Sequence, residues 1–391
     1  MKRHLSWPTL ALILGVAACS KNDDATELKK IPAIDLKAPA GGFTIDQSQW
    51  LRIAPQLTNA DGATYVWLSG ADTLSTSRDL LHVFAAPGET SLELKVKTAA
   101  GEAKQTVKVT VNAQVYTNGV FKVFDYVPAP GQFTNVLPSW AEGDDAAKMI
   151  AKAEESLKSN RAISLGGFGG YVVMGFDHTI INIPGAYNFQ VTGNAFNNWA
   201  EPGVIQVSAD VNRNGLPDDT WYEIAGSDYN HEKTVHKYEI TYYKPAADKV
   251  PTPNNDYPFI TDSTYIKWTD NQGKSGYYSK NSFHAQNYFP NWKGDKLVLS
   301  GTKIREDHLR DQSGTGSYYV LPALDFGYAD NWSNGDEKSG IKISWAVDDK
   351  GKPANLKGID FIRVHTGMRA EGGWLGEVST EVGGVKDLNL K

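Results

Sequence analysis

The 391-residue chain contains one cysteine, Cys19. A single thiol cannot form an internal disulfide, so the fold cannot depend on disulfide bridges. Basic residues are not in excess either: 39 Lys and Arg face 45 Asp and Glu, and the formal net charge is −6. Because nucleic-acid-binding domains carry a basic footprint, no nucleic-acid partner is expected.

Signatures of common enzymes are also missing from the sequence. No Gly-x-Ser-x-Gly nucleophile elbow occurs. The glycine-rich stretch 164–172, "SLGGFGGYV", lacks the Lys-Ser/Thr ending of a phosphate loop and indicates a turn. His178, His231 and His236 lack the spacing of a zinc protease. The sequence therefore favours a non-enzymatic protein. A glycosidase carboxylate pair stays open, because sequence does not show its separation in space.

The N-terminal apolar run, Leu10–Ala18, is too short to span a bilayer as a helix. It follows Lys2 and Arg3, and together these features predict an export signal over residues 1–18. The tail "VAAC" resembles a bacterial lipobox, which implies that Cys19 is lipidated and becomes the mature N-terminus. Lipidation also explains why an exported chain keeps one thiol.

Residues 19–30 are polar and without periodicity, which indicates a flexible tether. Their "KNDD" resembles the acidic export signal of surface-exposed Bacteroidetes lipoproteins. The resemblance implies a lipid-anchored protein of the outer membrane that faces the cell exterior. A chance cysteine after an ordinary cleaved signal is the alternative.

An immunoglobulin-type β-sandwich is predicted for residues 31–113. Strands of period two alternate there with Gly and Asp turns. In the segment 90–111, one face of each strand of a closing hairpin is apolar: Leu92, Leu94 and Val96, then Val107, Val109 and Val111. The strand around Trp67, followed by this hairpin, resembles a PKD-like domain. Trp67 is predicted to be a core residue.

A larger, jelly-roll-like β-sandwich is predicted for residues 120–391, so the fold class is all-β with one short helix. The helix is expected within 143–160, with Ala146, Ala147, Ile150, Ala151 and Leu157 on or near one face. Eight strand candidates follow it: 169–180, 186–194, 203–210, 220–226, 237–245, 295–302, 341–348 and 359–367.

Long stretches of this second part resemble a family of Bacteroidetes cell-surface lipoproteins that carry an N-terminal PKD-like domain. The stretches are "GGYVVMGFDHTIINIPGAYNFQVTGNAF", "AEPGVIQVSADVNRNGLPDDTWYEIAGS", "GYADN", "WAVDDKGKP", "IDFIRVHTG" and "GWLGEVSTEV". The resemblance implies a protein encoded near outer-membrane, TonB-dependent uptake systems, in some cases for corrinoids. The resemblance identifies no catalytic residues in this chain.

The segment "DVNRNGLPDD", 210–219, spaces its oxygen-bearing side chains as a calcium loop does. Calcium takes six to eight hard oxygens, placed by alternating residues around a glycine. The predicted ligands are Asp210, Asn212, Asn214, the Leu216 carbonyl and Asp218, with Gly215 at the turn. Trp221 replaces the bidentate Glu of an EF-hand, and strand-like sequences flank the loop. A plain hairpin loop whose Asp and Asn side chains bond their own backbone is the alternative.

Four tryptophans in turn-like contexts are the candidate ligand-binding residues. Aromatic rings stack on sugars or on large conjugated ligands at little entropic cost, and loop tips on a rigid sandwich are where binding residues usually sit. They are Trp199, Trp292, Trp332 and Trp374. The alternative for each ring is a plug that closes one end of the sandwich.

The sequence therefore predicts a lipid-anchored surface protein that captures a corrinoid or a glycan for an outer-membrane transporter. A glycan-active hydrolase and a purely adhesive or structural surface protein are the competing hypotheses.

Overall fold

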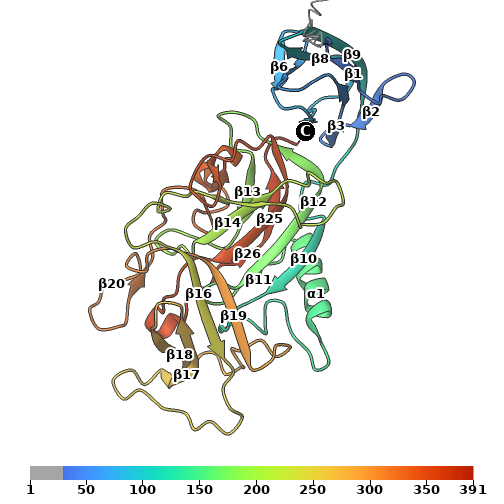
Figure 1. Cartoon of the computed structure of the whole chain (residues 1–391). Helices are drawn as coiled ribbons and strands as arrows, with labels where there is room; N and C mark the ends of the chain where they lie inside the picture. The colour runs from blue at the N-terminus through green and yellow to red at the C-terminus, as the bar shows by residue number, and fades with distance from the viewer. Residues whose placement is uncertain (1–29, 391) are drawn as a thin grey trace, which may run out of the picture.

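The computed structural model describes residues 30–390, which form an N-terminal module and a larger C-terminal domain (Figure 1). The predicted signal peptide, the lipidation site Cys19 and nearly all of the tether lie outside the described residues. The described chain is built mostly of strands, so the all-β fold class is confirmed. No helix within residues 30–390 has both the length and the apolar character needed to cross a membrane.

The N-terminal module is an immunoglobulin-type sandwich. Its main sheet has the order β2-β9-β8-β5-β6, and the pairs β3-β7 and β1-β4 complete it. The predicted hairpin is confirmed as β8 and β9, and its six apolar residues are buried together with Trp67. The strands are β1 (Ala33–Asp35), β2 (Phe43–Asp46), β3 (Trp50–Ile53), β4 (Gln56–Thr58), β5 (Thr64–Ser69), β6 (Asp72–Ser75), β7 (Leu80–Val83), β8 (Gly88–Thr98) and β9 (Gly101–Asn112).

The C-terminal domain is organised around a central sheet of order β10-β12-β25-β14-β15-β24, with β22 paired to β14. Alternating apolar residues of β12, β14 and β25 face the main hydrophobic core, which includes Val172, Ile205 and Ile362. The strands are β10 (Lys122–Val127), β12 (Tyr171–Ile181), β14 (Gly203–Ser208), β15 (Trp221–Ile224), β22 (Tyr328–Ala329), β24 (Ala346–Val347) and β25 (Gly358–Thr366).

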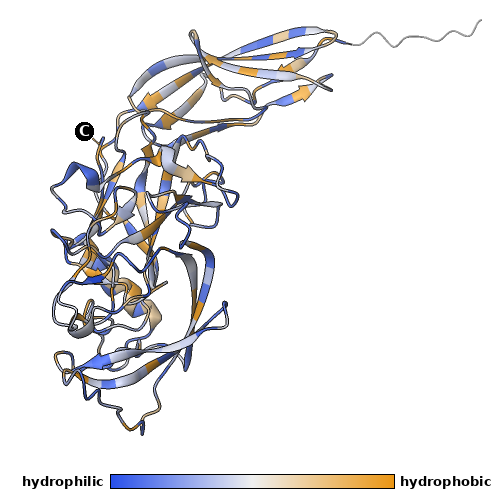
Figure 2. Ribbon diagram, turned by 90° about the vertical axis from the view of Figure 1, so that its left-hand side faces the viewer, coloured by the Kyte–Doolittle hydropathy of each residue, from blue (hydrophilic) through white to orange (hydrophobic). Residues whose placement is uncertain are grey.

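Smaller sheets complete this domain. The sheet β18-β17-β16-β19 has its own aromatic core, with Tyr238, Tyr242 and Phe289, and lies at the end far from the N-terminal module (Figures 1 and 2). The remaining pairings are β23-β13-β27, β11-β26 and β20-β21. The bounds are β11 (Ile163–Ser164), β13 (Phe189–Thr192), β16 (Val235–Tyr243), β17 (Ile260–Asp270), β18 (Ser275–Asn281), β19 (Lys296–Lys303), β20 (Arg310–Asp311), β21 (Tyr319–Val320), β23 (Gly340–Ile341), β26 (Glu381–Val382) and β27 (Gly384–Asp387); short 3₁₀ turns span Glu337–Ser339, Ile343–Trp345 and Gly373–Leu375.

Seven of the eight strand candidates form strands at their predicted places. The candidate at 341–348 is interrupted by a 3₁₀ turn at Ile343–Trp345, and only short strands on either side of this turn are extended. Strands β10, β17 and β18 were not anticipated. β17 pairs with β18 through two register shifts, and such irregularities break the period-two pattern from which a strand is predicted.

The predicted helix is confirmed as α1 (Ala146–Lys158), capped by the Asp145 carboxylate, which accepts from the Lys148 N–H. Its predicted face was partly wrong. The buried residues are Met149, Ala153, Ser156 and Leu157, whereas Ala146, Ala147 and Ala151 are exposed. Alanine tolerates either environment, so the larger Met149 side chain determines which stripe packs on the sheet.

The junction between the two parts contains a buried carboxyl group. Asp360 accepts hydrogen bonds from Trp50 Nε1 at 2.7 Å, from Thr179 Oγ1 at 2.6 Å and from the Asp210 N–H at 2.7 Å. Burial raises the pKa of Asp360 to about 6. The Trp50 ring packs with Val83 and Ala209, so the junction combines apolar contact with a shared acceptor.

Candidate functional site

A cavity of about 270 Å³ opens where the central sheet, the Gly373–Leu375 turn and the segment after β18 meet. Two of the four candidate tryptophans lie in its wall. The lining residues are Gln132, Phe133, Asn194, Phe196, Trp199, Glu201, Phe283, His284, Trp374, Leu375, Ser379 and Glu381. Aromatic side chains and a few convergent polar groups are the usual lining of a small-molecule site.

Exposed aromatic rings surround the mouth of this cavity. Phe196 is 64% exposed, Phe283 62% and Trp374 40%. The Trp374 Nε1 donates to the Ser317 carbonyl at 3.2 Å, and the Phe283 ring meets the Trp374 ring edge to face at 6.0 Å. Large apolar rings left in water at a concave surface are typical of a binding site.

A tight turn places Trp199. The backbones of Phe196 and Trp199 exchange two hydrogen bonds, and Asn198 between them has a φ of 62°, a conformation that asparagine tolerates. The Ala200 N–H then donates to the Leu321 carbonyl. Trp199 is therefore held from both sides, half-buried against a small core that includes Leu321.

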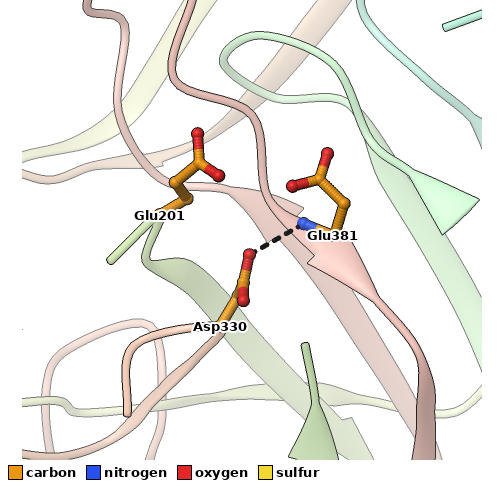
Figure 3. A group of neighbouring side chains, drawn as sticks. All are labelled: Glu201, Asp330 and Glu381. Atoms are coloured by element: carbon orange, nitrogen blue, oxygen red, sulfur yellow. Dashed lines mark hydrogen bonds between the residues drawn. The ribbon is translucent and has the colours of Figure 1, made fainter. Parts of the chain in front are cut away.

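Buried carboxyl groups form the floor. Glu201 stands just before β14, Asp330 just after β22, and Glu381 at the start of β26; Figure 3 shows the three side chains around a common space. One oxygen from each lies within 4.8 Å of the others. Segments far apart in the sequence thus bring three acids together, of which Glu201 and Glu381 line the cavity.

Both carboxyl oxygens of Asp330 accept hydrogen bonds from backbone N–H groups. Its Oδ1 accepts from the N–H groups of Asn194 at 2.7 Å and Ala195 at 2.8 Å, and its Oδ2 accepts from the Glu381 N–H at 3.0 Å. A side chain on Gly193 would collide with the Asp330 carboxyl group, so glycine allows this close approach. Asp330 positions both the 193–195 segment and Glu381.

Glu201 and Glu381 have fewer donors. Glu201 Oε1 accepts from the Ser379 N–H at 3.1 Å, and Glu381 accepts from Ser379 Oγ at 2.6 Å and from Asn194 Nδ2 at 3.2 Å. Within residues 30–390, no N–H group donates to Glu201 Oε2. Glu201 is 8% exposed and Glu381 4%, so these oxygens have little access to water outside the cavity.

The floor is electrostatically unusual because burial is not compensated by positive charge. Burial raises the pKa of Glu201 well above its ordinary value, and the neighbouring Glu381 and Asp330 carboxyl groups raise it further. Burial and Glu381 raise the pKa of Asp330 to about 8. Burial also raises the pKa of Glu381, and the hydrogen bond from Ser379 opposes that rise.

Two more acids stand behind the cavity wall. Glu377 accepts from the Gln132 N–H at 2.8 Å, and burial raises its pKa to about 8. Glu371 accepts from the Ser279 N–H at 2.8 Å, and burial raises its pKa to about 7. Gln132 also donates to the Leu375 carbonyl at 2.7 Å, which ties the wall to the turn that carries Trp374.

The other two candidate tryptophans lie away from this cavity. Trp292 packs against the main core, stacked on Tyr126 at 6.3 Å. Trp332 donates through Nε1 to the Leu324 carbonyl at 2.8 Å, and the Lys338 amine lies 4.2 Å from its ring centre. The structure thus brings together Trp199 and Trp374 and leaves Trp292 and Trp332 in packing positions.

The predicted calcium loop connects β14 to β15 as an exposed hairpin loop, and Gly215 has a φ of 72°. Asp210 accepts from the N–H groups of Asn214 and Gly215, at 3.0 and 2.9 Å. The Asn212 and Asn214 amides both donate to the Asp218 carboxylate at 2.9 Å. The side chains converge as predicted, and their hydrogen bonds also satisfy the plain-hairpin alternative. Calcium stays a prediction.

A polar cleft of about 490 Å³ lies beside this hairpin. Strand register places Arg363, Gln206 and Glu223 side by side on one face of the central sheet, and Arg363 donates to Gln206 Oε1 at 2.8 Å. Burial raises the pKa of Glu223 to about 7, and Trp221 lines the same cleft.

Sequence reasoning did not find the carboxyl floor. Glu201, Asp330 and Glu381 are separated by more than a hundred and by about fifty residues of chain, and no motif spacing links them. The only local signal was "GWLGEVSTEV", which holds Trp374, Glu377 and Glu381 within ten residues.

The comparison with protein families matches the N-terminal module. Residues 31–98 match the family model of the PKD-like domain, which confirms the N-terminal prediction. No curated protein matches the chain.

Solved structures give partial matches. A quinonprotein alcohol dehydrogenase-like protein (BT1487) from Bacteroides thetaiotaomicron matches at 20% identity over 24% of this chain and 23% of that one, with a TM-score of 0.20. The mixed-linkage glucan utilization locus protein SGBP-B of Bacteroides ovatus matches at 14% identity over 64% and 46% of the two chains, with a TM-score of 0.19. The SusE-like protein BT2857 matches at 8% identity over 88% and 95%, with a TM-score of 0.26. This chain spans less than half the length of the first two.

Proposed function

We propose that this chain is a lipid-anchored protein of the cell surface that captures a saccharide in the aromatic cavity without converting it. One observation carries the proposal: three exposed aromatic rings surround a concave site whose floor is polar and buried. Rings stack on the apolar faces of sugars, and carboxyl and amide groups accept or donate hydrogen bonds to hydroxyls.

The size of the cavity favours a saccharide over a corrinoid. Drug-sized ligands occupy pockets of about 300–1,000 Å³. A cavity of about 270 Å³ lies just below that range, so it suits a small sugar better than a macrocycle with its substituents.

A corrinoid is the second candidate, on a different observation. A larger, open cavity of about 1000 Å³ lies between the 244–251 segment and the sheet of β17 and β18. Pro245, Ala247, Pro251 and Tyr265 give it an apolar lining on the scale of a macrocycle. Under either candidate, we propose that an outer-membrane transporter receives the ligand.

The geometry of the floor supports binding rather than hydrolysis. Glycosidase carboxyl groups stand about 5–5.5 Å apart in retaining enzymes and about 6.5–9.5 Å apart in inverting ones, on either side of the scissile bond. An oxygen of Glu201 and an oxygen of Glu381 instead lie within 4.8 Å of each other, which is closer than either spacing.

A saccharide array followed by calorimetry tests the proposal. The full chain should bind at least one oligosaccharide, and Trp199→Ala and Trp374→Ala should each weaken that binding. Trp332→Ala is the matched control, because its ring lies outside the cavity. Binding that survives both cavity substitutions would place the ligand elsewhere, and a corrinoid that binds where no saccharide does would favour the second candidate.

A further inference from the structure

The floor of the cavity concentrates acid without a counter-charge. Glu201 and Glu381 line it, and Asp330 and Glu377 are buried behind them. Of the described residues that line the cavity, none is Lys or Arg. Burial lowers the pKa of its one histidine, His284, which disfavours the charged form of that ring. Since burying several carboxyl groups without a cation is costly, the site is complementary to a positive charge that enters with a ligand.

The wall of the cavity is an independent indication that the ligand is positively charged. Phe196, Phe283 and Trp374 expose their rings at its mouth, and Trp199 lines it. The face of an aromatic ring attracts a cation placed within about 6 Å of its centre. The rings and the acids belong to different segments and converge on one space.

These observations favour an organic ammonium group over a metal ion. Calcium requires six to eight oxygen ligands. Asp330 already accepts three backbone N–H groups, so two carboxyl groups remain to face the cavity, and much of the remaining wall is aromatic carbon. An ammonium group has three donors and needs only a few acceptors.

We propose that the captured saccharide carries a free amino group, and that this group is bound as an ammonium ion by Glu201 and Glu381 beneath the aromatic rings. The inference rests on the proposed function and names the class of sugar. Glu201 Oε2, which receives no N–H donor from the described residues, is the first acceptor. Glu381 is the second.

Binding should release a proton. In the free protein the two carboxyl groups, each with an oxygen within 4.8 Å of the other, favour holding a proton, because burial raises the pKa of both. An ammonium group that donates to both replaces that proton, which leaves for solvent. The affinity should therefore rise with pH until the ligand amine itself loses its proton.

The experiment compares glucosamine tetramers with N-acetylglucosamine tetramers, using calorimetry on the full chain at pH 7. We expect the amine form to bind at least tenfold more tightly, with a heat that depends on the ionisation enthalpy of the buffer. Glu201→Gln and Glu381→Gln keep the shape and remove the charge, so each should abolish the preference. Glu232→Gln, an exposed position, should retain it. Melting curves show which variants are folded. The buffer dependence of the binding heat is measured on the wild-type protein, so this test does not depend on the variants.

The outcomes distinguish a failure of the ammonium assignment from a failure of saccharide capture. Equal or tighter binding of the acetylated tetramer overturns the ammonium assignment and leaves saccharide capture intact. Binding of the acetylated tetramer that disappears in a chelator would place a metal ion on the floor and also overturn it. If neither tetramer nor any other saccharide binds, the proposed function fails and the inference fails with it.

Discussion

At the scale of single residues, the four candidate tryptophans separate into two environments. Trp374→Ala removes a ring that is 40% exposed at the cavity mouth, so ligand binding should weaken by about 1–3 kcal/mol with little change in melting temperature. Trp292→Ala removes a ring that packs on the main core and should cost about 3 kcal/mol of stability with ligand binding unchanged. Calorimetry and melting curves on both variants check this. A loss of stability for Trp374→Ala without a loss of binding would contradict it.

The buried acids should make the stability of the protein depend on pH. The native pKa is about 8 for Asp330 and Glu377 and about 7 for Glu371, whereas an unfolded carboxyl group titrates near 4. Between these values the native state binds more protons than the unfolded state, so the free energy of unfolding falls as pH rises from about 4.5 to 8.

Melting curves across this range check the sign. Glu377→Gln should flatten the slope, because a neutral amide does not titrate. A melting temperature that rises steadily from pH 5 to 8 would show that the acids are compensated by a charge.

The residues differ in how well the sequence predicted them. Trp199 and Trp374, which line the cavity, could be named as candidates because aromatic rings in turn sequences are a local signal. Glu201 and Asp330 could not, since each is one acid beside a short strand, and its partners come from pairings distant in sequence. A cluster whose residues come from distant strands has no fixed spacing in the sequence, so no motif predicts it.

At the scale of elements, the hairpin of β14 and β15 carries the calcium prediction. If calcium binds the 210–219 loop, a chelator should lower the melting temperature, since a tenfold excess of ligand over Kd stabilises the folded state by about 1.4 kcal/mol. Asp210→Ala should abolish the calcium dependence, because its carboxylate is the first ligand of the loop. Asp61→Ala, exposed in the N-terminal module, is the control. No heat and no shift at millimolar calcium would establish a plain hairpin.

Elements were predictable where one face is uniformly buried. The hairpin of β8 and β9 alternates without interruption over its core residues, and it was predicted residue by residue. α1 was found by its period, yet its buried stripe was misjudged because alanine gives no directional signal. β17 and β18 were missed because register shifts interrupt their alternation.

At the scale of the whole molecule, the junction should couple the unfolding of the two parts. Trp50→Phe keeps most of the ring and removes the Nε1 donor to Asp360, so the buried acceptor loses a hydrogen bond. We expect a loss of about 1–3 kcal/mol and earlier proteolytic cleavage in the 113–119 linker. Trp67→Phe is the comparison within the module, because Trp67 Nε1 donates to the Arg78 carbonyl and does not reach the junction. Equal linker cleavage in both variants would show that the junction does not hold the parts together.

Anchoring is the last prediction. Cys19→Ala should release the protein from the membrane, because one thiol carries all the lipid. Labelled palmitate and fractionation check it, and protease added to intact cells tests exposure on the outside. Palmitate incorporated equally by the variant would contradict the lipobox assignment, and full protection from protease would place the protein on the inner leaflet.

The C-terminus lies beside the N-terminal module, whereas the sheet of β17 and β18 lies at the opposite end (Figure 1). Asp387 is fixed there by Asn118, just before the second domain begins. A tag added after the last residue would therefore attach at the module end. On a biosensor surface, such a tag would attach each molecule by the module end, with the sheet of β17 and β18 farthest from the surface.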